Sequence, residues 1–107
     1  MDFDFIIKMK DMISYYLKCI DIEMKGENLT AQEHFEKYGI NDFYLRKTCA
    51  IKNYNADYLT FILKRAYELG YFLSPSDDIL KQVNEELKNQ PFPEHKYPIA
   101  ESSADLD

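Results

Sequence analysis

Apolar residues recur at steps of three and four along the chain as far as Asn89, which is the spacing of amphipathic helices. The first such run covers 3–25, with lysines and aspartates between the apolar positions. Its apolar face carries Ile6, Met9, Ile13, Ile20 and Met24. Gly26 then provides a stop, because glycine tolerates the left-handed conformation that closes many helices. We therefore predict one long helix over 3–25.

A second helix is predicted to begin after Thr30. Thr30 and Glu33 have the spacing of a capping box, in which each side chain accepts a hydrogen bond from the backbone of the other. This helix should end near Gly39, and a third should follow almost at once with Asn41 as its N-cap. The third helix should extend to about Ala50. Together the two predict a helix-turn-helix at the centre of the chain.

Two further helices are predicted downstream. The fourth covers 56–70, after a short loop at 52–55 that contains two asparagines. The fifth begins with Ser74 as its cap, Pro75 at the first helical position and Asp77 closing a capping box. Its apolar stripe carries Ile79, Leu80, Val83 and Leu87.

The composition changes beyond Asn89. Residues 91–107 hold three prolines and four acids against one lysine, which is typical of an extended or flexible tail. The whole chain of 107 residues has only 3 Gly and 4 Pro, too few for a turn-rich β-sandwich or barrel. The predicted fold class is therefore all-α: a compact five-helix domain over 1–90 with a central helix-turn-helix, and an acidic tail over 91–107.

Charge is distributed unevenly along the chain. The formal net charge is −6, yet residues 41–65 hold five bases against two acids. The local positive field is therefore concentrated in the segment that contains the third helix and the start of the fourth.

The central segment resembles a known DNA-binding family. LTAQEHFEKYGI (29–40), followed by NDFYLRK (41–47), is similar to the Xre/Cro-type, lambda-repressor-like helix-turn-helix. That family has Leu-Thr before its second helix, Lys-x-Gly-Ile at the turn and Tyr-Leu early in its recognition helix. KRAYELG (64–70) resembles the family's fourth helix. The resemblance covers about 29–70.

The resemblance implies a DNA-binding surface on the third helix, which would enter the major groove. Asp42, Phe43 and Lys47 fall at base-reading positions, with Asn41 and Arg46 beside them. The loop after the third helix, and an amide just inside the second, would contact phosphates. The full set assigned to DNA binding is Gln32, Asn41, Asp42, Phe43, Arg46, Lys47, Lys52 and Asn53.

Three positions depart from the family's pattern. Ala31 stands where the family has its phosphate-contacting amide, so that Gln32 lies one position late. His34 replaces a leucine, and Phe35 replaces the small residue that lets the two helices approach. We expect Phe35 to separate the helices or repack the turn. A buried, hydrogen-bonded histidine is the expected role of His34.

Two functions from different classes remain open. One is a small DNA-binding regulator of the Cro/repressor kind, a homodimer through the first or fifth helix, typical of a phage or mobile element. It would bind double-stranded DNA. The other is an acidic protein-binding module, such as an inhibitor, antitoxin or immunity-type protein, that binds a basic partner. The negative net charge favours the second function.

The sequence shows no pattern typical of an enzyme, a cofactor site or a metal site. The acidic pairs 77–78 and 85–86 are expected to be a helix cap and a solvated helix face. Two distant histidines and two lone cysteines, Cys19 and Cys49, give no zinc spacing, and the cysteines are expected to be unpaired thiols. The chain lacks an apolar run of membrane-spanning length, and a cytoplasmic location is expected.

Overall fold

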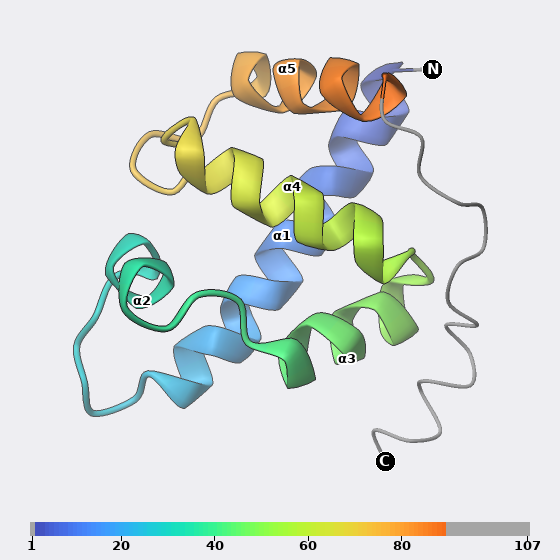
Figure 1. Ribbon diagram of the computed structural model, residues 1–107. Helices are drawn as coiled ribbons and strands as arrows, with labels where there is room; N and C mark the ends of the chain where they lie inside the picture. The colour runs from blue at the N-terminus through green and yellow to red at the C-terminus, as the bar shows by residue number, and fades with distance from the viewer. Residues whose placement is uncertain (1, 90–107) are drawn as a thin grey trace.

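Five α-helices follow one another in residues 2–89, the part of the chain that the computed structural model describes. They are α1 (Asp2–Glu23), α2 (Ala31–Tyr38), α3 (Asp42–Lys52), α4 (Ala56–Glu68) and α5 (Asp77–Lys88) (Figure 1). The described residues form no strand, so the predicted all-α fold with five helices is confirmed. The tail predicted over 91–107 lies outside the described residues.

α1 is the central element of the domain. It contacts all four other helices, and α4 lies across it and packs against both α3 and α5 (Figure 1). The fully buried face of α1 is the apolar face that the sequence predicts. The largest buried residues come from α1, α4 and α5, namely Tyr16, Ile6, Met9, Met12, Ile13, Ile20, Leu59, Ile62, Leu63, Leu80 and Val83. Each such side chain stabilises the fold by about 1.5–3 kcal/mol through removal from water.

α2 is held differently from the other helices, because His34 is its only buried residue. Its neighbour Phe35 is half-buried and stacks on Tyr67 near the end of α4, with ring centroids 4.5 Å apart. Phe35 also meets the edge of Phe72, in the loop after α4, at 5.8 Å. The bulky ring therefore packs α2 against the far end of α4 and the loop that follows it.

The caps of α2 and α3 are those that the sequence predicts. The Thr30 hydroxyl accepts from the Glu33 amide at 3.1 Å, and the Glu33 carboxylate accepts from the Thr30 amide at 2.9 Å. Gly39 adopts a φ of 74° at the end of α2, and Asn41 caps α3 by accepting from the Tyr44 amide at 3.1 Å. Only residues 39–41 separate the two helices.

The start of α5 differs from the prediction. Its N-cap is Ser76, whose hydroxyl accepts from the Asp78 amide at 3.1 Å, and not Ser74. The reason lies upstream: the Ser74 amide donates to the Gly70 carbonyl at 3.0 Å, so the chain is still turning there. Pro75 consequently precedes the cap and is not the first helical residue.

One buried hydrogen bond joins α1 to the connection between α2 and α3. The Tyr16 hydroxyl accepts from the Asn41 amide at 2.8 Å, and the Tyr16 side chain is 1% exposed. Burial raises the pKa of Tyr16, although the Asn41 hydrogen bond opposes this shift. The bond fixes the start of α3 against the second half of α1.

An ion pair joins α4 to α5. Arg65 donates to both carboxylate oxygens of Glu86, at 2.7 and 2.9 Å, and to Glu68 at 2.6 Å. The prediction that Glu86 is a solvated side chain is therefore wrong, because this side chain is only 31% exposed and its carboxylate binds Arg65. The hydrogen bond from Arg65 lowers the pKa of Glu86 below its usual value.

We expect Tyr16→Phe to lower the free energy of unfolding by about 1–3 kcal/mol, because it leaves a buried amide without an acceptor. Urea denaturation followed by circular dichroism measures this change. Tyr54→Phe is the matched control, since the Tyr54 hydroxyl is buried without a hydrogen-bond partner among the described residues. Tyr54→Phe should leave stability unchanged or raise it. Equal losses in the two variants would contradict the role of the Asn41 hydrogen bond.

The Glu86 pair should make stability depend on acid pH. A carboxylate whose pKa is lowered by folding contributes stability above its ordinary pKa of 4.5, and this contribution is lost as pH falls through the lowered value. Glu86→Gln should therefore lower the urea midpoint at neutral pH, and the difference from the wild type should shrink towards pH of about 3. Glu85→Gln, at the exposed neighbour, serves as control. A constant difference at both pH values would contradict the pair's contribution.

Candidate functional site

The outer face of α3 brings together most of the residues that the resemblance assigns to DNA. Leu45, Thr48 and Cys49 face the core and fix the rotation of the helix. The opposite face presents exposed or half-exposed residues: Asp42, Phe43, Arg46, Lys47 and Asn53. Four of these residues therefore lie on α3 away from its core-facing side, and Asn53 follows as the C-cap.

The backbone and the side chain of Asn41 already form hydrogen bonds within the fold. Its side-chain oxygen caps α3, its backbone amide donates to Tyr16, and its side-chain nitrogen lies 3.5 Å from Glu23. Because both ends of the side chain already have partners, base contact by Asn41 would require giving up the helix cap.

Gln32 and Lys52 lie away from this face. The Lys52 ammonium group binds Asp11 at 2.9 Å and lies 5.2 Å from the centre of the Tyr15 ring, so it packs against α1. Lys52 is the last residue of α3, and not a loop residue as predicted. Gln32 donates to Glu36 at 3.2 Å, one turn along α2. Neither side chain is oriented as a phosphate contact.

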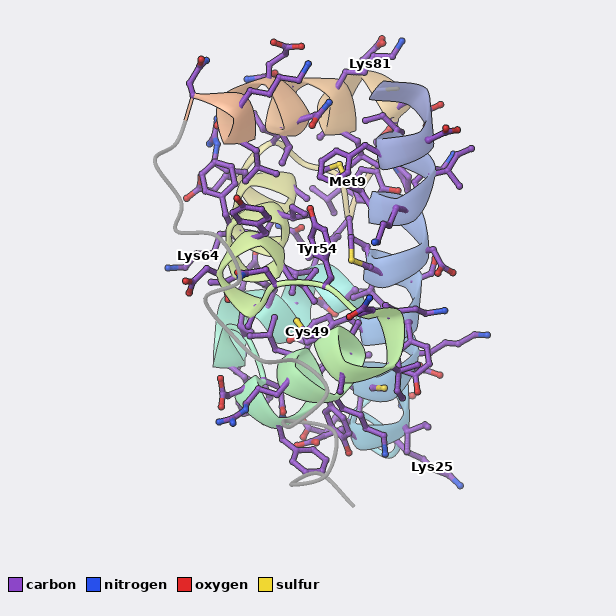
Figure 2. All side chains as sticks on the ribbon, turned by 90° about the vertical axis from the view of Figure 1, so that its right-hand side faces the viewer. Met9, Lys25, Cys49, Tyr54, Lys64 and Lys81 are labelled. Carbon is purple, nitrogen blue, oxygen red and sulfur yellow. The ribbon has the colours of Figure 1, made fainter. Side chains whose placement is uncertain are left out.

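Three lysines outside α3 illustrate where other positive charges lie. Figure 2 shows Lys25, Lys64 and Lys81 projecting from separate parts of the surface, while Cys49 and Tyr54 lie inside. Arg46 and Lys47 have no ion-pair partner among residues 2–89 and are the unpaired positive charges of α3. The positive charge of α3 is thus confined to its middle.

Carboxylates gather where α3 begins. A pocket of about 390 Å³ opens between the end of α1, the end of α2 and the first turn of α3. We call it the acidic pocket, and its lining residues are Glu23, Glu27, His34, Tyr38, Ile40, Asn41 and Asp42. Glu23 and Glu27 were not predicted as site residues, since only the packing of α1 against α3 brings them beside Asp42.

The carboxylates of the acidic pocket are only partly neutralised. The Tyr38 hydroxyl donates to both oxygens of Glu27, at 3.1 and 3.3 Å, and the Lys37 ammonium group lies 3.8 Å from the same carboxylate. Within residues 2–89, no cation is paired with Glu23 or Asp42. The first turn of α3 therefore carries a negative surface.

His34 lies at the inner side of this pocket. The side chain is 5% exposed, and its ring centre lies 4.8 Å from that of Tyr38. The expected hydrogen bond of a buried histidine is not found between the His34 ring and the other described residues. His34 is thus a largely buried side chain that lines the pocket.

Other chemistry receives little support from the described residues. They contain no group of three His, Cys, Asp or Glu side chains arranged to hold a metal ion. Both cysteines are free thiols, as predicted, and burial raises the pKa of the Cys49 thiol to about 12. Such a thiol is a poor nucleophile, because the thiolate is the reactive form. Across residues 2–89, none of the helices has the length and apolarity needed to cross a membrane.

Comparison with family models, with curated proteins and with solved structures gives no match for this chain. The functional argument therefore depends on the geometry and charge of the surface around α3.

Proposed function

We propose that this chain is a protein-binding module that uses the start of α3 and the acidic pocket to bind a basic partner. The observation that carries the proposal is the position of three carboxylates, Glu23, Glu27 and Asp42, around the first turn of α3. An inhibitor, antitoxin or immunity-type protein would use such a surface against a positively charged target.

Electrostatics favours a basic protein over DNA at this surface. DNA-binding proteins gain most of their affinity by neutralising phosphates with lysine and arginine. Here the end of α3 that would approach the bases is flanked by carboxylates, and the chain has a net charge of −6. A carboxylate about 4 Å from a phosphate costs about 1 kcal/mol even in water. The same charges attract a basic protein surface and speed its association.

Exposed aromatic rings beside the carboxylates support a protein partner further. Tyr38, at the end of α2, is 51% exposed, and Phe43, in the first turn of α3, is 50% exposed. Tyrosine and phenylalanine are enriched in the cores of protein interfaces, where they are surrounded by polar residues. Aromatic anchors bordered by acids therefore fit a recognition surface for a basic protein.

Affinity capture from the source cells tests the proposal. A captured protein, identified by mass spectrometry and purified separately, should bind the wild type directly. The double variant Glu23→Gln/Asp42→Asn should weaken its dissociation constant by about tenfold or more, because close charge pairs are lost. Glu85→Gln, an equally exposed acid on α5, should not change it. Equal binding by all three proteins would place the interface elsewhere.

A second candidate function, DNA binding through α3, is favoured by the unpaired Arg46 and Lys47 on its outer face. In that case the chain would be a dimeric regulator of the Cro/repressor kind, with two copies of α3 in successive major grooves. The resemblance of residues 29–70 to that family supports this candidate.

A duplex titration separates the two functions. With a pool of random-sequence duplexes at low salt, we expect no binding tighter than about 100 µM, weaker than usual non-specific affinities. The measurement is fluorescence anisotropy at two salt concentrations. Binding that falls steeply with salt and is lost in Lys47→Ala, with Lys81→Ala as control, would support the regulator and reject the protein-binding module.

A further inference from the structure

His34 is a second, independent sign that the acidic pocket has an occupant. His34 is 5% exposed, and no hydrogen bond joins its ring nitrogens to another described residue. Its nitrogens are not among the fully enclosed atoms without a partner, so they can be reached from outside the core. Polar groups of largely buried side chains usually have a hydrogen-bond partner, in the protein or in bound water. Because His34 lines the pocket, a bound group would be its natural partner.

The polar groups around the pocket are mainly acceptors. Asp42 has no partner cation within residues 2–89, and Glu23 accepts a long hydrogen bond of 3.5 Å from the side-chain nitrogen of Asn41. The His34 ring adds two nitrogens, one of which can accept a hydrogen bond when only the other carries a proton. The complementary ligand must therefore carry several donors and a positive charge.

A guanidinium group fits this requirement better than a metal ion or an ammonium group. The described residues provide no metal-binding arrangement. Guanidinium has five N–H donors in one plane and no acceptor, so it can bind two carboxylates and a ring nitrogen at once. It is also more weakly hydrated than ammonium, and therefore enters a partly buried site more readily. The pocket volume of about 390 Å³ accommodates this group and part of its aliphatic stem.

From this geometry we infer that the acidic pocket binds the guanidinium group of an arginine side chain, held between Glu23, Asp42 and His34. That the arginine belongs to a partner protein rests on the proposed function. The binding of guanidinium itself does not, and it can be measured on the chain alone.

Titration with Nα-acetyl-arginine amide, followed by ¹H–¹⁵N NMR at constant ionic strength, tests the inference. The expected result is saturable shifts at the His34 ring and at the amides of Asn41 and Asp42. Nα-acetyl-citrulline amide has nearly the same shape without the charge, and should cause no shifts there. Equal shifts with citrulline amide, or tighter binding of Nα-acetyl-lysine amide, would overturn the inference.

Variants place the binding in the pocket. Asp42→Asn and Glu23→Gln should each weaken the dissociation constant for arginine amide by about two- to fivefold, the effect of losing one accessible ion pair. His34→Phe should weaken binding by a similar factor or more, because it removes the ring nitrogens and keeps an aromatic ring of similar size. If His34→Phe fails to fold, Asp42→Asn and Glu23→Gln alone test whether arginine amide binds in the pocket. Glu85→Gln should bind like the wild type, and weakening in that variant equal to the others would overturn the pocket assignment.

The outcomes separate this inference from the proposed function. If arginine amide fails to bind while the captured partner still depends on Glu23 and Asp42, the guanidinium assignment is wrong and the protein-binding proposal stands. If arginine amide binds as expected while the chain binds duplexes and has no protein partner, the pocket assignment stands and the proposed function is wrong.

Discussion

The hydrogen bond between the Asn41 amide and the Tyr16 hydroxyl fixes where the acidic pocket forms. Tyr16 is buried in the core by the packing of α1 against the other helices, and this packing holds its hydroxyl in one position. By accepting from the residue that caps α3, it sets the first turn of that helix beside the end of α1. The carboxylates of Glu23 and Glu27 lie beside Asp42 as a result. Core packing and surface charge are thus linked through one polar contact.

Local signals in the sequence predicted the local structure well. The Thr30–Glu33 box, the Gly39 turn and the Asn41 cap involve residues within a few positions of each other, and all are confirmed. The Ser74 prediction was wrong because the Gly70 carbonyl, four residues earlier, holds the chain in a further turn. The number and type of the helices therefore followed from the spacing of apolar residues. The start of α5 did not, because it depends on the turn between Gly70 and Ser74, which this spacing does not reveal.

The site was less predictable than the helices, because its charges come from distant parts of the chain. The face of α3 could be inferred from its register, but the partners of Lys52 and Glu86 lie on α1 and α4. Glu23 and Glu27 look like ordinary solvated residues at a helix end, and only the tertiary contact gives them a role. A motif inferred from residues 29–47 therefore cannot include the carboxylates of Glu23 and Glu27, which the fold brings beside the first turn of α3.

The weak attachment of α2 has a consequence for the motions of the domain. This helix has eight residues and buries one side chain, and its other anchor is the stack of Phe35 on rings near the end of α4. Segments with few buried contacts open at the lowest free-energy cost in native proteins. α2 is accordingly the wall expected to fluctuate first, together with the Glu27 carboxylate that Tyr38 binds, while α1 and α3 hold Glu23 and Asp42. The acidic pocket thus combines two carboxylates on well-packed helices with a third that moves with α2.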